Sequence, residues 1–191
     1  MNRKGFLQSL LGASAFASIP YASYGKSGPS INELLDRISL PTSGNLFGFS
    51  AEPISKVKIG IIGLGNRGTT LIEMFQWLVE QDRAEIVALS DLEEKKVIRA
   101  KEKIGLWQKV IPKIYSGEAT EWKNLAQQDN IDLIIIATPW EMHAPMAIYG
   151  MENNKHVATE VPIAYTLSEC WKIIQTAERT RKHCIMAENC C

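Results

Sequence analysis

Short apolar runs alternate with amphipathic segments from residue 57 to the end of the chain. Uninterrupted apolar runs predict strands, and apolar positions at helical spacing predict helices. The predicted strands are 57–63, 85–91, 112–116, 131–138, 156–161 and 184–189, and the predicted helices are 69–81, 92–105, 119–128, 144–154 and 167–182. Strict alternation implies right-handed crossovers in a parallel sheet covered on both faces. The pattern therefore predicts an α/β fold, a doubly wound parallel sheet with strand order 3-2-1-4-5-6.

Several large apolar side chains fall at helical spacing inside the predicted helices. We expect them to belong to the core rather than to a site. They are Met74, Phe75, Trp77, Met146 and Trp171.

The first 56 residues have a different composition. Residues 1–20 place Arg3 and Lys4 before an apolar stretch with small residues, which is the order of an export signal, and the stretch is too short to be a stable membrane anchor. The signal is twin-arginine-like, with Lys4 in place of the second arginine, and predicts a periplasmic location. A disordered or surface-lying amino terminus is the alternative. Residues 21–56 are rich in Gly, Ser and Pro and predict a linker, with one helix-like patch at 31–40. The predicted domain spans 57–191.

Charge and cysteine usage narrow the classes of partner. Lys plus Arg and Asp plus Glu number 21 each, so no net field attracts nucleic acid or an anionic membrane, and we expect neither as a partner. Cys170, Cys184, Cys190 and Cys191 share no metal-ligand spacing, so we predict no metal site and favour free, mostly buried thiols. A disulfide stays open if the protein is exported.

The first predicted strand ends in GLGNRG, the G-x-G-x-x-G spacing of a dinucleotide-binding turn. Gly63 permits a tight turn, Gly65 lets the backbone approach a pyrophosphate, and Gly68 lets the next helix pack closely. Asp91 ends the second predicted strand, where a carboxylate binds the adenosine ribose and repels a 2′-phosphate. The sequence therefore predicts NAD as cofactor.

Two further strand ends carry polar residues. Thr138 ends the fourth predicted strand, and Glu160 lies near the end of the fifth. The residues after Thr138 that we expect to face the cofactor are Pro139, Trp140, Glu141 and His143. Ligands of such sheets bind at the carboxyl ends of the strands, so we expect Trp140 to offer an apolar wall, His143 a polar contact, and Glu160 a position near the nicotinamide ribose. For Glu141, capping of the next helix is an equally good interpretation.

The glycine loop, Asp91, the segment ATPWEMHAPMA and the Glu-x-Pro of EVP together resemble the nucleotide-binding half of the Gfo/Idh/MocA oxidoreductase family, a Rossmann fold. Within it, TPWEMHAPMAIYGMENNKHVATEVP, SECW and RTRKHCIMAENCC are more similar to family 109 of the glycoside hydrolases, whose known activity is α-N-acetylgalactosaminidase. The resemblance implies a cofactor site lined by Asn66, Arg67, Asp91, Trp140, Glu141, Met142, His143, Glu160, Val161 and Asn189.

The same resemblance implies a reaction. In the hydrolase family, bound NAD oxidises the sugar at C3, the C2 proton and the C1 substituent leave, water adds, and the hydride returns. Many dehydrogenases of the wider family have lysine where this chain has Val161, which favours the hydrolase. The resembled proteins continue into a substrate domain beyond the position of Cys191, so no catalytic residue is named, and this chain alone is expected to be inactive. A sugar dehydrogenase and a non-catalytic NAD-binding remnant are the alternatives, and a homo-oligomer stays open.

Overall fold

The computed structural model describes residue 46 and residues 48–188, which all belong to one compact unit, Ser39–Cys191. The predicted export signal, most of the predicted linker, Asn189, Cys190 and Cys191 lie outside the described residues.

The described part of the chain folds into one six-stranded parallel sheet with the order β3-β2-β1-β4-β5-β6. This confirms the predicted doubly wound α/β fold. Strands and helices alternate along the chain as β1 (Val57–Ile62), α3 (Asn66–Glu80), β2 (Ala84–Asp91), α4 (Glu94–Ile104), β3 (Lys113–Ser116), α5 (Glu121–Ala126), β4 (Leu133–Ile136), the 3-10 turn η1 (Trp140–Met142), α6 (His143–Glu152), β5 (His156–Thr159), α7 (Leu167–Thr180) and β6 (Cys184–Met186).

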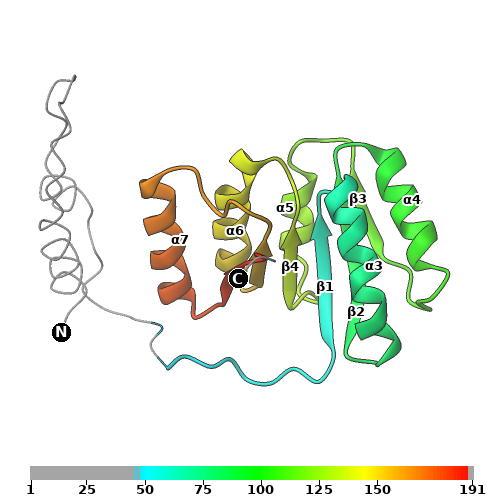
Figure 1. The fold of residues 1–191 in the computed structure, drawn as a ribbon, viewed down its shortest axis with the longest axis horizontal. Coiled ribbons are helices and arrows are strands. Elements are labelled where there is room, and N and C mark those ends of the chain that lie inside the picture. The colour runs from blue at the N-terminus through cyan, green and yellow to red at the C-terminus, as the bar shows by residue number, and fades with distance from the viewer. Residues whose placement is uncertain (1–45, 47, 189–191) are drawn as a thin grey trace, which may run out of the picture. The chain divides into compact units, whose positions relative to one another are not determined.

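Two apolar layers sandwich the sheet. Helices α3 and α4 cover one face, and helices α5, α6 and α7 cover the other (Figure 1). Alternate residues of a strand point to opposite faces of the sheet. Ile135 of β4 packs in the layer of α3 and α4, whereas Ile134 and Ile136 pack in the layer of α5, α6 and α7. Burial on both faces explains why the strands read as continuous apolar runs.

Strand register brings the candidate residues to one edge. Ile62 of β1 pairs with Ser90 of β2 and with Ile136 of β4, and Ile136 pairs with Thr159 of β5. The residues that follow these positions, Gly63, Asp91, Ala137 and Glu160, therefore leave the sheet together at its carboxyl edge.

Two residues predicted for the core are exposed. The side chains of Met74 and Trp77 on α3 are 62% and 65% exposed, whereas Phe75 and Met146 pack in the core and Trp171 is half-buried. The prediction was wrong for Met74 and Trp77 because Leu71, Ile72, Phe75, Leu78 and Val79 already form the stripe that faces the sheet. Trp77 is two residues from Phe75 and from Val79, which puts it on the opposite side of the helix.

The described end of the predicted linker lies against the domain. The ring of Phe49 is centred 4.7 Å from that of His183, which precedes β6, and the guanidinium of Arg181 lies 4.4 Å from the Phe49 ring centre. The thiols of Cys170 and Cys184 are free and half-buried, and burial raises the pKa of Cys184 to about 12. Within residues 48–188, no helix is both long and apolar enough to cross a membrane.

Candidate functional site

The glycine loop between β1 and α3 is built around two crowded positions and one open position. Gly63 has φ +90°, and a Cβ there would lie 2.6 Å from the Ala137 carbonyl. A Cβ on Gly68 would lie 1.9 Å from the carbonyl oxygen of Gly63, so the turn and helix touch through their backbones. A Cβ on Gly65 would meet nothing within 4 Å. The space above Gly65 is therefore open to a ligand.

The amino terminus of α3 faces that open space without a protein partner of its own. Gly65 is the N-cap residue, no side chain of the described region caps the helix, and its first turn carries no acidic residue. The first amides of a helix need acceptors, and the helix dipole favours an anion there. This arrangement suits the pyrophosphate of a dinucleotide.

Asp91 is fixed beside the loop by two backbone amides. Its Oδ2 accepts a hydrogen bond from Leu64 at 2.7 Å, and its Oδ1 accepts one from Glu93 at 2.9 Å. A carboxylate has about four acceptor positions, so two remain for ribose hydroxyls. Lys96 lies 4.0 Å from Asp91 and forms its closer ion pair, of 2.6 Å, with Glu93. The hydrogen bond to Glu93 raises the pKa of Lys96, so this cation is already paired beside Asp91.

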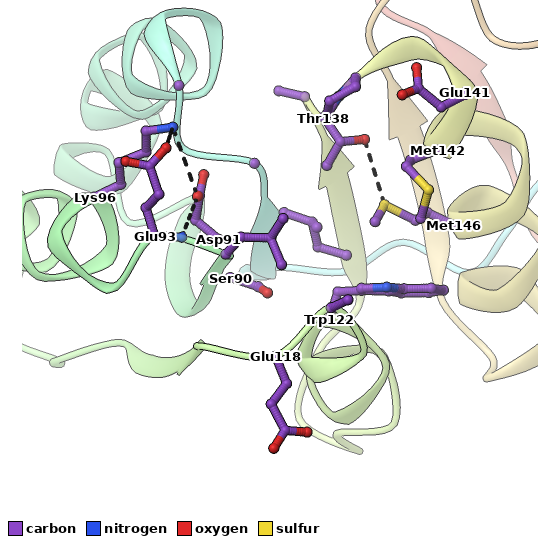
Figure 2. Close-up of a pocket in the computed structure, with 17 residues that line it drawn as sticks. Ser90, Asp91, Glu93, Lys96, Glu118, Trp122, Thr138, Glu141, Met142 and Met146 are labelled. Carbon is purple, nitrogen blue, oxygen red and sulfur yellow. Dashed lines mark hydrogen bonds and ion pairs between the residues drawn. The ribbon is translucent and has the colours of Figure 1, made fainter.

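A cavity of about 640 Å³ extends from the loop along the carboxyl edge of the sheet, which is within the size range of cofactor sites. Figure 2 shows Asp91, Glu93 and Lys96 on one side and Thr138, Met142 and Met146 on the other, with the Trp122 ring beneath. Its lining residues are Ile62, Gly63, Gly65, Ser90, Asp91, Leu92, Glu93, Lys96, Glu118, Ala119, Trp122, Ala137, Thr138, Pro139, Glu141, Met142 and Met146.

Sequence reasoning missed the contribution from the segment after β3. Glu118, Ala119 and Trp122 line the cavity although none was a candidate. The signal was available, because β3 pairs with β2 and its carboxyl end therefore lies beside Asp91. Met146 was predicted for the core, and it both packs there and lines the cavity, where its sulfur accepts a hydrogen bond from Thr138 at 3.6 Å.

The side chains of the segment after β4 lie in three different environments: the cavity, the solvent and the core. Glu141 and Met142 line the cavity, and Glu141 makes no capping hydrogen bond to α6. Trp140 is 56% exposed, is absent from the cavity lining, and pairs with Tyr165 at a ring separation of 6.0 Å.

His143 is fully buried at the start of α6. Its Nδ1 lies 2.8 Å from the carbonyl oxygen of Pro162, and its Nε2 lies 2.9 Å from that of Thr138. Carbonyl oxygens only accept hydrogen bonds, so the ring donates to at least one of them and connects the segments after β4 and β5. This geometry favours a positioning role for His143 over direct contact with a cofactor.

Glu160 pairs with the glycine loop across the site. Its Oε1 lies 2.8 Å from the Nε of Arg67, and Glu160 is followed by half-buried Val161. Asn66, by contrast, is exposed at the first position of α3. Asn189 lies outside the described residues. Within residues 48–188, no three His, Cys, Asp or Glu side chains are grouped so that they could hold a metal ion.

These features fit a dinucleotide. The open surface at Gly65 and the free α3 terminus suit its phosphates, Asp91 suits its adenosine ribose, and the cavity supplies an apolar enclosure. All of them lie within one fold unit.

Known proteins are similar to this chain in sequence and in fold. The model of the Gfo/Idh/MocA oxidoreductase family, NAD-binding Rossmann fold, matches residues 57–188. An α-N-acetylgalactosaminidase of Bacteroides fragilis is 40% identical over 151 residues, covering 79% of this chain and 35% of that protein. An α-N-acetylgalactosaminidase of Shewanella oneidensis is 44% identical over 150 residues, covering 78% of this chain and 32% of that protein.

The crystal structure of the WlbA dehydrogenase of Chromobacterium violaceum, in complex with NADH and UDP-GlcNAcA, superposes with a TM-score of 0.62 at 22% identity, covering 72% of this chain and 37% of that one. The chain thus spans about a third of the length of the curated relatives it matches. The family match covers the whole sheet and its cofactor edge. This chain belongs to the Gfo/Idh/MocA oxidoreductase family, of which it carries the NAD-binding Rossmann-fold domain.

Proposed function

We propose that this chain is the NAD-binding part of an exported glycoside hydrolase that acts on α-N-acetylgalactosaminides. The observation that carries the proposal is the 40% to 44% identity to proteins named α-N-acetylgalactosaminidase over about four fifths of the chain. Val161 supports it, because an isopropyl group cannot do the proton transfer for which a lysine serves in dehydrogenases of the wider family.

The proposed reaction needs a cofactor that is used and restored in each turnover. Bound NAD would supply a reversible hydride acceptor. The sugar would be oxidised at C3, lose its C2 proton and its C1 substituent, gain the hydroxyl of water at C1 and a proton at C2, and be reduced again at C3. This chain contributes binding and orientation. The α3 terminus holds the phosphates, Asp91 holds the adenosine ribose, and the segments after β4 and β5 surround the nicotinamide end. The proton-transfer groups belong to parts of the relatives that this chain does not match.

Export fits this chemistry. Residues 1–20 have the order of an export signal. An enzyme outside the cytoplasm has no pool of free NAD, so a recycled and tightly held cofactor would let it work there. A route that exports folded proteins would carry enzyme and cofactor together.

The test uses the protein as its source produces it, with its intact mass measured first to establish its length. We expect release of the aryl group from an aryl α-N-acetylgalactosaminide without net accumulation of NADH. Net NADH formation from a free sugar would replace the proposal with a sugar dehydrogenase. Saturable NAD binding without either reaction would leave a nucleotide-binding module.

A further inference from the structure

We propose that Arg67 is a positioning residue that holds the Glu160 carboxylate toward the nicotinamide end of the bound dinucleotide. This inference rests on the proposed NAD site and adds a division of labour within it. Arg67 and Glu160 would form one functional unit instead of two independent cofactor contacts.

The pair joins two segments that are far apart in the sequence. Arg67 is the second residue of α3 and lies within the glycine motif, and Glu160 directly follows β5. Because β4 lies between β1 and β5 in the sheet, the ion pair spans the carboxyl end of β4. Neither side chain lines the cavity, which includes Gly65, two residues before Arg67. A bound dinucleotide would pass beside the ion pair on its way from Asp91 to the segment after β5.

Burial makes this contact different from a surface ion pair. The Glu160 side chain is 13% exposed and the Arg67 side chain is 40% exposed, while the two atoms that meet, Nε and Oε1, are both buried. Removing one partner from a buried pair leaves an uncompensated charge, which costs far more than loss of a surface pair. Arg67 therefore holds the Oε1 side of the Glu160 carboxylate at a contact in which neither of the two meeting atoms is exposed to solvent.

The pair also keeps hydrogen-bonding capacity that the protein does not use. Arg67 Nε and Glu160 Oε1 approach to 2.8 Å but are not aligned as a hydrogen bond, and neither atom has another hydrogen-bond partner in the described chain. Buried polar atoms without partners call for an explanation, and a bound ligand is one. A ribose hydroxyl can donate a hydrogen bond to the carboxylate.

A double-mutant cycle on NAD binding tests this division of labour. The variants are Arg67→Lys, which keeps the positive charge but loses the planar guanidinium, Glu160→Gln, and the two combined, with Arg99→Lys on the exposed face of α4 as the matched control. Affinities for NAD and for ADP are measured by calorimetry on the whole chain. We expect each single variant to weaken NAD binding about tenfold, the double variant to weaken it by about the same factor, and Arg99→Lys to leave it unchanged.

If the two side chains contacted the cofactor independently, the losses of NAD affinity in the single variants would multiply, to about a hundredfold in the double variant. That result would overturn the proposal. ADP lacks the nicotinamide ribose, so all the variants should bind it within about threefold of the parent chain; an equal loss of ADP and NAD affinity in Arg67→Lys would make Arg67 a phosphate ligand only. If Glu160→Gln fails to fold in a melting experiment, Glu160→Asp replaces it in the cycle. Absence of NAD binding by the parent chain would instead count against the proposed function.

Discussion

Gly65 and Gly68 differ in what a side chain would meet at each position. A methyl group on Gly68 would lie 1.9 Å from the Gly63 carbonyl oxygen, whereas one on Gly65 would meet no protein atom within 4 Å. We expect Gly68→Ala to destabilise the fold by roughly 1 to 3 kcal/mol and to abolish NAD binding. Gly65→Ala should leave the free energy of unfolding within about 1 kcal/mol of the parent and still weaken NAD binding at least tenfold, because its methyl group occupies ligand space. Urea unfolding and NAD titration of both variants measure the two effects, and a destabilised Gly65→Ala with parental NAD affinity would contradict the assignment.

His143 is predicted to act through structure. Replacing it with Leu removes every hydrogen bond that the ring donates to the carbonyls of Thr138 and Pro162, and we expect a loss of roughly 1 to 3 kcal/mol of unfolding free energy. Asn carries its amide nitrogen near the position of Nδ1 and Gln near that of Nε2, so a variant that keeps a donated hydrogen bond should lose about half as much. Urea unfolding of the three variants measures this series. Equal losses in all three would contradict a role in joining the two segments.

The residue types at the site were predictable, but some of their partners were not. The glycine spacing and Asp91 can be recognised in the sequence, because the backbone of a dinucleotide-binding turn accepts few other residue types at these positions. The pairing of Arg67 with Glu160 depends on how strand order brings β5 near β1, and no local pattern encodes it. The sequence predicted that His143 contacts the cofactor. Its burial instead follows from the packing of α6 against the sheet, which no local pattern shows.

At the scale of elements, the N-terminus of α7 is capped by side chains, one of which is a carboxylate, so its stability depends on pH. Thr166 and Glu169 form a capping box, and hydrogen bonds from the amides of Tyr165 and Thr166 hold the pKa of Glu169 below its ordinary value of 4.5. Because the pKa of Glu169 is lower in the folded state than in the unfolded state, the ionised carboxylate stabilises the fold above pH 4.5. This stabilisation is lost as the pH falls below 4.5 and through the folded-state pKa.

We therefore expect Glu169→Gln to lower the unfolding free energy at neutral pH by less than about 1 kcal/mol, because the carboxylate is exposed to solvent, and to flatten its decline in acid. Thr166→Ala should cost about 1 kcal/mol at either pH. Urea unfolding at neutral pH and at about pH 3.5 measures these effects, with exposed Glu102→Gln as control. An acid dependence as steep in Glu169→Gln as in the parent would contradict the assignment.

Element order and sheet topology were predictable from the chain because each strand and helix has its own apolar period and the crossover rule leaves few topologies. The periodicity alone did not tell which apolar residues of α3 face the sheet. Met74 and Trp77 share the helix with a sufficient core stripe, and only the contacts of α3 with β2 and α4 show which side is buried.

At the scale of the whole molecule, the cofactor edge is assembled from segments between Gly63 and Glu160, all inside one fold unit. The chain nevertheless spans about a third of its curated relatives. Because all described residues of the cofactor edge lie in this one unit, we expect NAD binding by this chain itself.

We expect the 191-residue chain to bind one equivalent of NAD and to be stabilised by it. A ligand that binds only the folded state stabilises it by mass action, so NAD at about one hundred times its dissociation constant should add about 2.7 kcal/mol and raise the melting temperature by roughly 5 to 10 °C. NADP should give a smaller shift at the same concentration, because its 2′-phosphate would lie beside Asp91, and the nearby Lys96 is already paired with Glu93. Melting curves with each cofactor measure the difference, with calorimetry for the stoichiometry. An equal or larger shift with NADP would show that Lys96 outweighs Asp91. A chain that neither cofactor stabilises would count against the proposed NAD site.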